Sequence, residues 1–444
     1  MAVGISYLSY DIPKIYLDIE EFSKYRNINT EKLKKGLGLY KMSICDVHQD
    51  TATLAGNALL KLITEHPLDP KSIHRIYLGT ESALDSSKPT GTYAVEMVED
   101  KLGDRVFKHT DVVDMTFACI GAVDVLQNAL DYIKVNPSHK AVVIASDFAK
   151  YDLGSPGEYT QGAGAVAMLV EANPKLMSFD GQFGVGFKSE HDFFKPRRYH
   201  AVNEHTKAYT TDEKLQVYRE EPVFDGQFSN QCYQDRIREA YYHLKDIKGT
   251  QDILHENWSS LIFHLPYAFH GKRIFSELYQ LEKDGVKAED VQPNLYDFEQ
   301  LKATAKSDDY QRFVNEKIID AQKASSQIGN MYAASIFMSL ISELCYKKGK
   351  LKAGNTFGFI AYGSGSKSKV FEGRLVDGFD EAIQNLDLEK TFNACTPIDF
   401  ETYEALHKKV KRQPVISPES EFALQGIDDE NAALVGKRHY AFID

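Results

Sequence analysis

Cys119, Glu81 and His264 are the side chains whose types and surroundings could support covalent and proton-transfer chemistry. Cys119 closes the apolar run VVDMTFACI (112–120) and precedes GAVDVLQNALDYIKV, in which apolar residues recur at helical spacing. The thiol is therefore expected at a strand-to-helix turn, where the positive end of the helix dipole would lower its pKa and favour a nucleophilic thiolate. Taken alone, a cysteine in an apolar run is more typical of core packing than of catalysis.

His264 and Glu81 also stand where apolar runs end. His264 lies in SSLIFHLPY (259–267), and an imidazole there could exchange a proton near neutral pH or polarise a thioester carbonyl. Glu81 lies in a polar loop after HRIYLGT, the position where open α/β sheets gather functional groups, and a partly desolvated carboxyl group there can move protons. A satisfied core histidine and a surface glutamate are the alternatives for each residue alone, so only the combination favours an active site.

The composition excludes several classes of protein. The chain has 444 residues, 43% of them hydrophobic, and a net charge of −12, which argues against broad affinity for nucleic acid. Neither a membrane-spanning apolar stretch nor a signal-peptide pattern is present in the sequence, which predicts a cytoplasmic protein. The five cysteines lack the spacing of a disulfide framework or a zinc site, and no metal is expected: Cys45, Cys119, Cys232, Cys345 and Cys395.

Short β-rich runs alternate with helical patterns in both parts of the chain, which predicts a sheet covered by helices. The expected division is an N-terminal half, 1–175, and a C-terminal half, 176–444, with an inserted polar segment at about 185–258. A polar tail after about 405 should wrap the surface. In the second half, GNMYAASIFMSLISELCYK (329–347) predicts a buried helix capped at Gly329-Asn330. The expected strands lie near 74–82, 112–120, 140–147, 164–172, 259–267 and 355–366.

Two further features concern ligands. His270, Lys272 and Arg273 follow His264 closely, and cations there could bind the phosphates of a carrier such as coenzyme A, although a solvated helix face is an equal alternative. The glycine-rich stretches at 155–168 and 362–366 have neither the Walker lysine nor the GxGxxG spacing, so they do not indicate a nucleotide site.

Six segments, in chain order, resemble the 3-hydroxy-3-methylglutaryl-CoA (HMG-CoA) synthase family of the thiolase superfamily, over roughly residues 5 to 370. They are GTESALDSSK, ACIGA, ASDFAKYDLGSPGEYTQGAGAVAM, FHLPY, GNMYAAS and AYGSGS, and TQGAGAVAM resembles the bacterial branch. The resemblance implies an α/β thiolase fold, with duplicated βαβαβ halves in five layers, α-β-α-β-α. It also implies a homodimer that condenses acetyl-CoA with acetoacetyl-CoA and water to HMG-CoA in the mevalonate route to isoprenoids, without a further cofactor.

By the same resemblance, Cys119 is the acylated nucleophile, Glu81 the general acid/base and His264 the residue that positions and polarises acetoacetyl-CoA. Six more residues are expected to bind substrate, with the two basic ones contacting coenzyme A: Asn330, Ser364, Thr160, Pro266, Lys272 and Arg273. Ketoacyl synthase III and chalcone synthase pair their cysteine with His and Asn, so Glu81 argues against them.

The chain departs from the family pattern at the cysteine turn and near His264. It reads CIGAV, with Ile120 and Val123 where CYGAT or CYGGT is usual, and Phe269 stands where bacterial members tend to carry a lysine. These departures keep open an enzyme that acts on β-ketoacyl chains carried by an acyl carrier protein, as in polyketide β-branching. A non-catalytic thiolase-fold subunit is a third hypothesis, disfavoured because a scaffold needs no reactive thiol.

Overall fold

The computed structural model describes residues 1–292, 295–431 and 433–444, and a nine-stranded mixed sheet runs through it. Its strands are β1 (Val3–Asp11), β4 (Arg75–Gly79), β5 (Asp111–Met115), β6 (Lys140–Phe148), β7 (Ala163–Ala172), β8 (Met177–Phe187), β13 (Ser260–Phe263), β14 (Thr356–Gly363) and β15 (Lys367–Leu375). They are ordered β13-β14-β15-β8-β1-β7-β6-β4-β5. Most are buried apolar runs, as expected of strands covered on both faces.

The sheet consists of two halves with the same topology. β4, β6, β7 and β1 lie side by side, with β4 parallel to β6 and the next two pairs antiparallel. β13, β14, β15 and β8 repeat this order and these orientations. The halves join where Val3–Ile5 of β1 pairs with Met177–Phe179 of β8. The predicted duplication is therefore confirmed, and β5 is the strand added at one edge.

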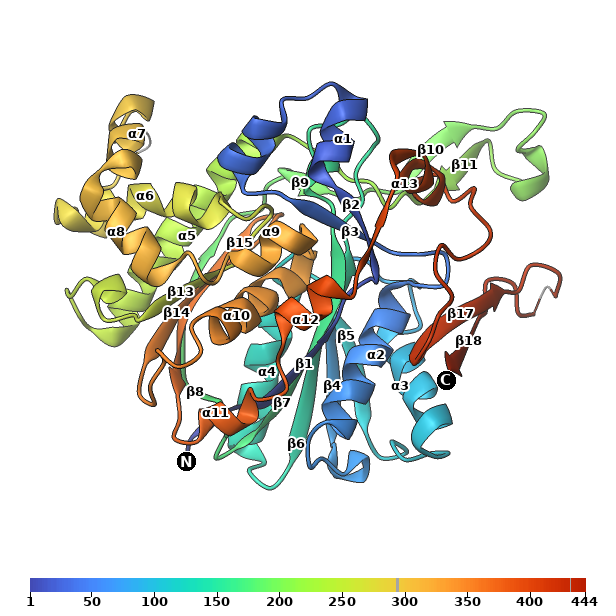
Figure 1. Cartoon of the computed structure of the whole chain (residues 1–444), viewed down its shortest axis with the longest axis horizontal. Helices are drawn as coiled ribbons and strands as arrows, with labels where there is room; N and C mark the ends of the chain where they lie inside the picture. The colour runs from blue at the N-terminus through green and yellow to red at the C-terminus, as the bar shows by residue number, and fades with distance from the viewer. Residues whose placement is uncertain (293–294, 432) are drawn as a thin grey trace.

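Helices cover and separate the two halves, which gives the five predicted layers (Figure 1). α2 (Thr51–Thr64) and α3 (Thr90–Leu102) lie outside the first half, and α5 (Gly226–Lys248) and α6 (His270–Lys283) lie outside the second. α4 (Gly121–Val135) and α10 (Ser335–Tyr346) form the central layer, and α4 contacts strands of both halves. α10 is buried from Ser335 to Leu344, because both of its faces meet sheet or helix.

The prediction of a buried helix near 329–347 is confirmed, but its start is wrong. Gly329 has a φ of +90° and ends α9 (Lys323–Ile328) instead of capping α10. A β-carbon at Gly329 would lie 2.1 Å from the carbonyl oxygen of Gln161, so this position requires glycine both for its conformation and for close packing. The chain then passes Asn330 in an irregular stretch, and α10 begins at Ser335.

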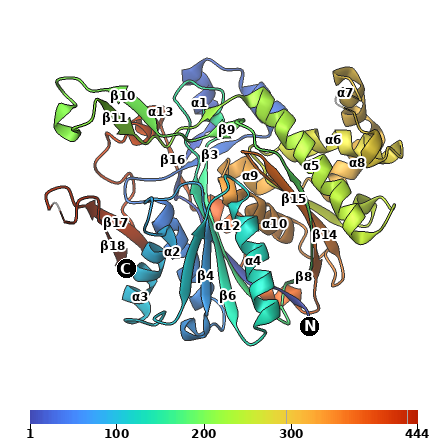
Figure 2. The same cartoon turned by 180° about the vertical axis from the view of Figure 1, so that it is seen from behind.

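The segment 185–258 contains two structurally different parts. α5 packs on β8 and β15 and so belongs to the covering of the second half. Before it, β9 (Phe193–Phe194) pairs with β12 (Val223–Phe224), and the hairpin of β10 (Arg198–Ala201) and β11 (Lys214–Val217) projects from the body between them (Figure 2). Only this projecting hairpin resembles an insertion into the layered fold.

Smaller elements complete the surface. β2 (Ile15–Asp18) lies between β3 (Lys41–Ile44) and β16 (Thr396–Ile398), next to α1 (Ile19–Arg26) and a π-helical turn at Lys32–Leu37. α7 (Phe298–Lys306) and α8 (Asp308–Lys317) follow α6, and α11 (Phe379–Ala382), α12 (Leu388–Asn393) and α13 (Phe400–His407) precede the tail. The tail ends in a hairpin of β17 (Glu421–Ile427) and β18 (Arg438–Ile443), whose Phe422 is buried against α2. In the described part of the chain, no helix is long and apolar enough to cross a membrane.

Candidate active site

The predicted functional residues follow the carboxyl ends of parallel strands in both halves. Glu81 follows β4, Cys119 follows β5, and Asp147 lies near the end of β6. In the second half His264 directly follows β13, and Ser364 directly follows β14. Because carboxyl ends of parallel strands open at one edge of a sheet, the duplicated topology collects these side chains from distant parts of the sequence.

Cys119 lies in a tight turn that is packed from several sides. β5 ends at Met115, so the strand stops five residues earlier than the apolar run suggested, and α4 begins at Gly121. Ala118 has a φ of +40°, an uncommon conformation for alanine that costs energy and is often found at functional sites. A β-carbon on Gly363 of β14 would lie 2.7 Å from Ile120, so the second half of the sheet packs directly against this turn.

The thiol of Cys119 donates a hydrogen bond to Oε2 of Glu81 at 3.3 Å. The structure thus brings two of the three predicted catalytic residues into contact. Burial, and next the nearby Glu81 carboxylate, raise the pKa of the Cys119 thiol well above its usual value. The sequence predicted that the α4 N-terminus would lower this pKa, whereas burial and the neighbouring negative charge raise it.

Asp147 holds Glu81 in this position from behind. One carboxylate oxygen, Oδ1, accepts hydrogen bonds from the Glu81 backbone N–H at 2.9 Å and from the Thr80 hydroxyl at 2.7 Å. The other, Oδ2, accepts from the Ala333 N–H at 2.9 Å. Burial, reinforced by the Glu81 charge, raises the pKa of Asp147. This one side chain ties together the loop after β4, the end of β6 and the stretch before α10.

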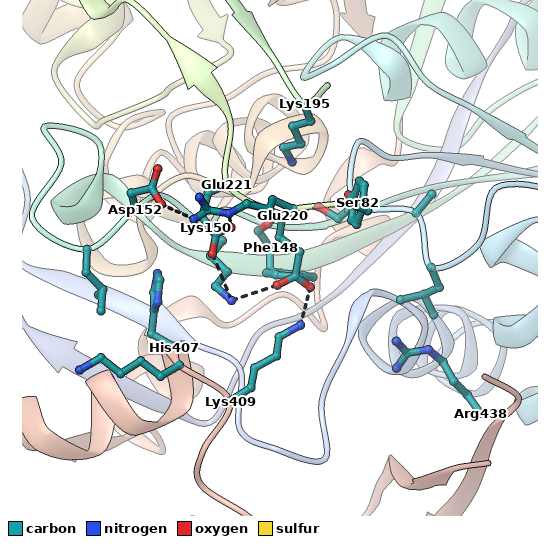
Figure 3. A pocket seen from close by; sticks show the side chains of 16 residues that line it. Ser82, Phe148, Lys150, Asp152, Lys195, Glu220, Glu221, His407, Lys409 and Arg438 are labelled. Carbon is teal, nitrogen blue, oxygen red and sulfur yellow. Dashed lines mark hydrogen bonds and ion pairs between the residues drawn. The ribbon is translucent and has the colours of Figure 1, made fainter. Parts of the chain in front are cut away.

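Lys195 provides the cation that the two carboxyl groups need. Its Nζ lies 3.1 Å from Oε1 of Glu81 and 4.6 Å from the centre of the Tyr332 ring. Lys195 also lines a cavity of about 710 Å³, together with Ser82, Phe148 and Lys150 (Figure 3). The ammonium group therefore lies between this cavity and Glu81.

His264 is buried in the second half of the site. Burial lowers the pKa of its imidazole to about 3, so the ring is neutral at physiological pH. Its carbonyl accepts a 2.7 Å hydrogen bond from the Tyr233 hydroxyl, while its buried Nδ1 has no partner within the described residues. Tyr332 links it to the nucleophile, because the backbone of Tyr332 contacts His264 and its side chain packs in a cluster with Cys119.

Four of the other predicted substrate residues follow or adjoin the catalytic side chains, and the two basic ones lie on α6. Thr160 and Asn330 meet where the Asn330 N–H donates to the Thr160 carbonyl at 2.8 Å, and Asn330 Oδ1 accepts from the Tyr332 N–H at 2.8 Å. Pro266 is half-buried two residues after His264, and Ser364 is half-buried in the turn after β14. Lys272 and Arg273 lie on α6, next to the π-helical turn. There the Phe269 N–H donates to the Leu37 carbonyl at 3.0 Å.

Comparisons with known proteins agree with this architecture. Residues 1–175 match the model of the hydroxymethylglutaryl-coenzyme A synthase N-terminal domain, and residues 213–425 match that of the C-terminal domain. The hydroxymethylglutaryl-CoA synthase of Haloferax volcanii is 31% identical, and the match covers 100% of both chains. The chain belongs to the hydroxymethylglutaryl-CoA synthase family. The enzyme of Enterococcus faecalis is 28% identical over 91% of each chain.

Solved structures of this family extend the likeness to three dimensions. A structure described as MvaS in complex with 3-hydroxy-3-methylglutaryl coenzyme A has a TM-score of 0.84 and 28% identity, covering 100% of this chain and 99% of that one. The HMG synthase of the curacin biosynthetic pathway has a TM-score of 0.80 at 20% identity, with both chains covered completely, and this likeness concerns the fold alone. The predicted family and thiolase-like fold are confirmed, while the roles of individual site residues stay predictions.

Asp147, Lys195 and Tyr332 also belong to this cluster of side chains, although they were not predicted from the sequence. Asp147 carried a usable signal, because it ends the apolar run KAVVIASD as Glu81 and His264 end theirs. Lys195 carried none, since it stands 114 residues after Glu81 in a polar segment and the ion pair exists only in the folded chain. Among the described residues, no group of three or more potential metal ligands comes together.

The histidine environment leads to a pH prediction. A folded-state pKa of about 3 lies below the ordinary value near 6.5, so His264 should remain neutral between pH 5 and 8. Two-dimensional NMR of ¹⁵N-histidine-labelled protein, assigned with a His264→Gln variant, should show no titration of its ring nitrogens in this range. An imidazole that takes up a proton with a midpoint near pH 6.5 would show that the ring is not desolvated as described.

Proposed function

We propose that this protein is an HMG-CoA synthase that condenses acetyl-CoA with acetoacetyl-CoA and water to give HMG-CoA and coenzyme A. The observation that carries the proposal is the hydrogen bond between the Cys119 thiol and Glu81, in a chain that belongs to the hydroxymethylglutaryl-CoA synthase family. The proposed enzyme needs no metal or redox cofactor, because every step is an acyl or proton transfer. The reaction supplies HMG-CoA to the mevalonate route to isoprenoids.

In the first half-reaction, Cys119 is acetylated. Its sulfur attacks the thioester carbonyl of acetyl-CoA while its proton passes to Glu81, the acceptor of the existing hydrogen bond. The tetrahedral intermediate collapses with cleavage of the carbon–sulfur bond to coenzyme A, and the departing thiolate takes the proton from Glu81. The products are acetyl-Cys119, free coenzyme A and a Glu81 carboxylate. Since thiol and carboxylate start in contact, the raised pKa of the thiol does not prevent attack.

In the second half-reaction, the acetyl group becomes the nucleophile. Glu81 removes a proton from its methyl group, and the resulting enolate attacks the ketone carbon of acetoacetyl-CoA. The new alkoxide takes that proton, and water then cleaves the thioester to Cys119 and restores the thiol. His264, being neutral, acts by donating a hydrogen bond that polarises the ketone. Backbone N–H groups in the turns of Cys119 and Ser364 are the proposed oxyanion donors.

Basic residues from two elements support a site for the coenzyme A phosphates. A β-carbon at Gly36 would lie 4.0 Å from the Arg273 guanidinium, so the π-helical turn and the start of α6 lie side by side. Lys32 and Arg273 are exposed there, and Lys272 lies with its ammonium 3.3 Å from the centre of the Phe269 ring. An acidic protein that binds anionic thioesters needs such a local concentration of positive charge.

The proposed assembly is a homodimer in the cytoplasm. β5 supports the dimer, because it ends the sheet and pairs only with β4 among the described strands. An unpaired edge of this kind is usually covered, and a second copy could continue the sheet. A non-catalytic scaffold remains the disfavoured reading, since it does not explain a buried thiol aligned with a carboxylate.

A carrier-protein substrate is the second candidate, favoured by Ile120 and Phe269. Ile120 is buried beneath the cysteine turn, and Phe269 replaces a lysine expected in bacterial members. One curacin pathway structure is described as an HMG synthase in complex with acetyl donor-ACP. In this alternative the chemistry at Cys119 is unchanged, and the β-ketoacyl acceptor arrives on an acyl carrier protein.

Acetylation of Cys119 provides the first test of the reaction. Mixing the enzyme with acetyl-CoA should add one acetyl group to the wild type and none to Cys119→Ala, as measured by intact-protein mass spectrometry. Adding acetoacetyl-CoA should then discharge the group as HMG-CoA. Cys232→Ala is the matched control, because this buried cysteine lies outside the Cys119 cluster and should be acetylated normally. Wild-type enzyme that gains no acetyl group would refute the proposal, and acetylation without discharge would favour the carrier-protein alternative.

Removing a phosphate contact provides the second test. Arg273→Met should raise the KM for acetoacetyl-CoA about tenfold, equivalent to about 1.4 kcal/mol, with little change in kcat, because the lost contact is the same before and during reaction. Steady-state kinetics of HMG-CoA formation measure both parameters.

Lys283→Met is the matched control, because Lys283 is an exposed basic residue at the other end of α6. Its kinetics should equal those of the wild type. Equal KM values for Arg273→Met and Lys283→Met would exclude the proposed phosphate contact.

A further inference from the structure

Lys195 is a buried charge that the proposed mechanism does not yet use. It comes from the base of the projecting hairpin, directly after β9, and its side chain is 12% exposed. Its ammonium meets Oε1 of Glu81 at 3.1 Å, while Oε2 of the same carboxylate accepts the hydrogen bond from the Cys119 thiol. The two carboxylate oxygens therefore have separate partners, one a permanent cation and the other the nucleophile.

The charges around Glu81 make this cation necessary. Asp147 accepts a hydrogen bond from the Glu81 N–H, so two buried carboxyl groups are adjacent, and like charges at such sites favour protonation of one of them. Among the described residues, the titratable groups that face the Glu81 charge are Cys119, Asp147, Lys195, Tyr151, Tyr218 and Tyr332. Burial keeps the three tyrosines neutral by raising their pKa values, which leaves Lys195 as the positive member of the group.

We propose that Lys195 is a positioning residue, which keeps Glu81 ionised and turns its Oε2 toward Cys119 and the acetyl group formed there. This inference rests on the proposed condensation. It adds an explanation of how Glu81 is kept in the ionised form that can act as a base. A carboxylate that must accept a proton from the thiol, and later from a methyl group, is useless if it already carries one. Lys195 acts through Glu81, whose carboxylate it contacts.

Aromatic side chains around Lys195 hold its ammonium group in place. Its ammonium lies over the Tyr332 ring, and Tyr332 has a φ of +43°, so an uncommon backbone conformation supports this contact. The neighbouring Phe193 of β9 packs with Phe224 of β12 against the cluster that contains Cys119. The base of the hairpin therefore places one cation in the wall of the cavity (Figure 3), where it pairs with Glu81.

Lys195→Met tests this role through the pH dependence of condensation. Without the cation Glu81 takes up a proton more readily, so the acidic limb of the kcat profile should move to higher pH by about one unit. At pH 7 kcat should fall about 10- to 100-fold, chiefly because Oε2 of Glu81 is no longer held toward Cys119, while the KM for acetyl-CoA stays within about twofold. Lys195→Arg keeps the charge and should restore the wild-type profile, since the adjacent cavity leaves room for the larger group.

Lys150→Met is the matched control. Lys150 lines the same cavity, is also 12% exposed and also pairs with glutamates, but its partners Glu220 and Glu221 keep Lys409 and Arg219 when it is removed. Its pH profile should equal that of the wild type. An effect of Lys150→Met as large as that of Lys195→Met would show a general loss of packing and would overturn the proposal.

A double-mutant cycle separates a positioning role from a folding defect. If Lys195 acts through Glu81, Lys195→Met should cost little further activity in a Glu81→Gln background, whereas independent effects would multiply. The Glu81→Gln, Lys195→Met double variant removes the carboxylate and the ammonium together. It therefore leaves no buried Glu81 carboxylate without its cation. Multiplicative losses would overturn the proposal.

The outcomes distinguish this inference from the proposed function. A wild type that condenses the two thioesters, together with an unshifted Lys195→Met profile, overturns the role of Lys195 alone. A wild type that neither accepts an acetyl group nor forms HMG-CoA overturns both.

Discussion

The contact between the Cys119 thiol and the Glu81 carboxylate is the interaction on which the rest of the site depends. Neither group would be useful alone in this buried position, because desolvation keeps the thiol protonated and a lone carboxylate would be unstable. Together they form a donor and an acceptor 3.3 Å apart. The Lys195 ammonium offsets the desolvation of the buried Glu81 carboxylate. On the other side, Asp147 accepts hydrogen bonds that fix the loop carrying Glu81.

The duplicated sheet explains how one half can serve the other. The first half supplies the thiol, the carboxylate and Asp147, while the second supplies His264 and the glycine-rich turn after β14. Gly363 allows that turn to approach the cysteine turn closely, and Gly79 allows α4 to lie against β4, where a β-carbon would be 2.5 Å from the Ala122 backbone. Gly363 therefore sets how closely the two halves can meet at the nucleophile, and Gly79 sets how closely α4 lies on its own half of the sheet.

The sequence predicted those features that depend on local pattern. Apolar runs located the strands, and Glu81, Cys119 and His264 became candidates because they lie at the ends of these runs, but only the family resemblance assigned them catalytic roles. Prediction from the sequence failed where the outcome depends on distant partners. The raised pKa of Cys119 depends on burial and then on the charge of Glu81, 38 residues away, and the place of Lys195 depends on how a projecting segment folds back. The cap at Gly329 was misread for a similar reason, since its packing against Gln161 is invisible in the local sequence.

The central claim is that Glu81 is the base that activates the acetyl group on Cys119. It is tested most directly by incubating enzyme with acetyl-CoA in D₂O without acetoacetyl-CoA, and measuring deuterium in the methyl group of the acetyl-enzyme by mass spectrometry. Wild type and Glu81→Gln are compared at equal acetyl occupancy. The account predicts deuterium uptake in the wild type and at least a hundredfold slower uptake in Glu81→Gln, by analogy with the loss of a general base, worth about 10²- to 10⁴-fold. Equal uptake in both proteins would contradict it.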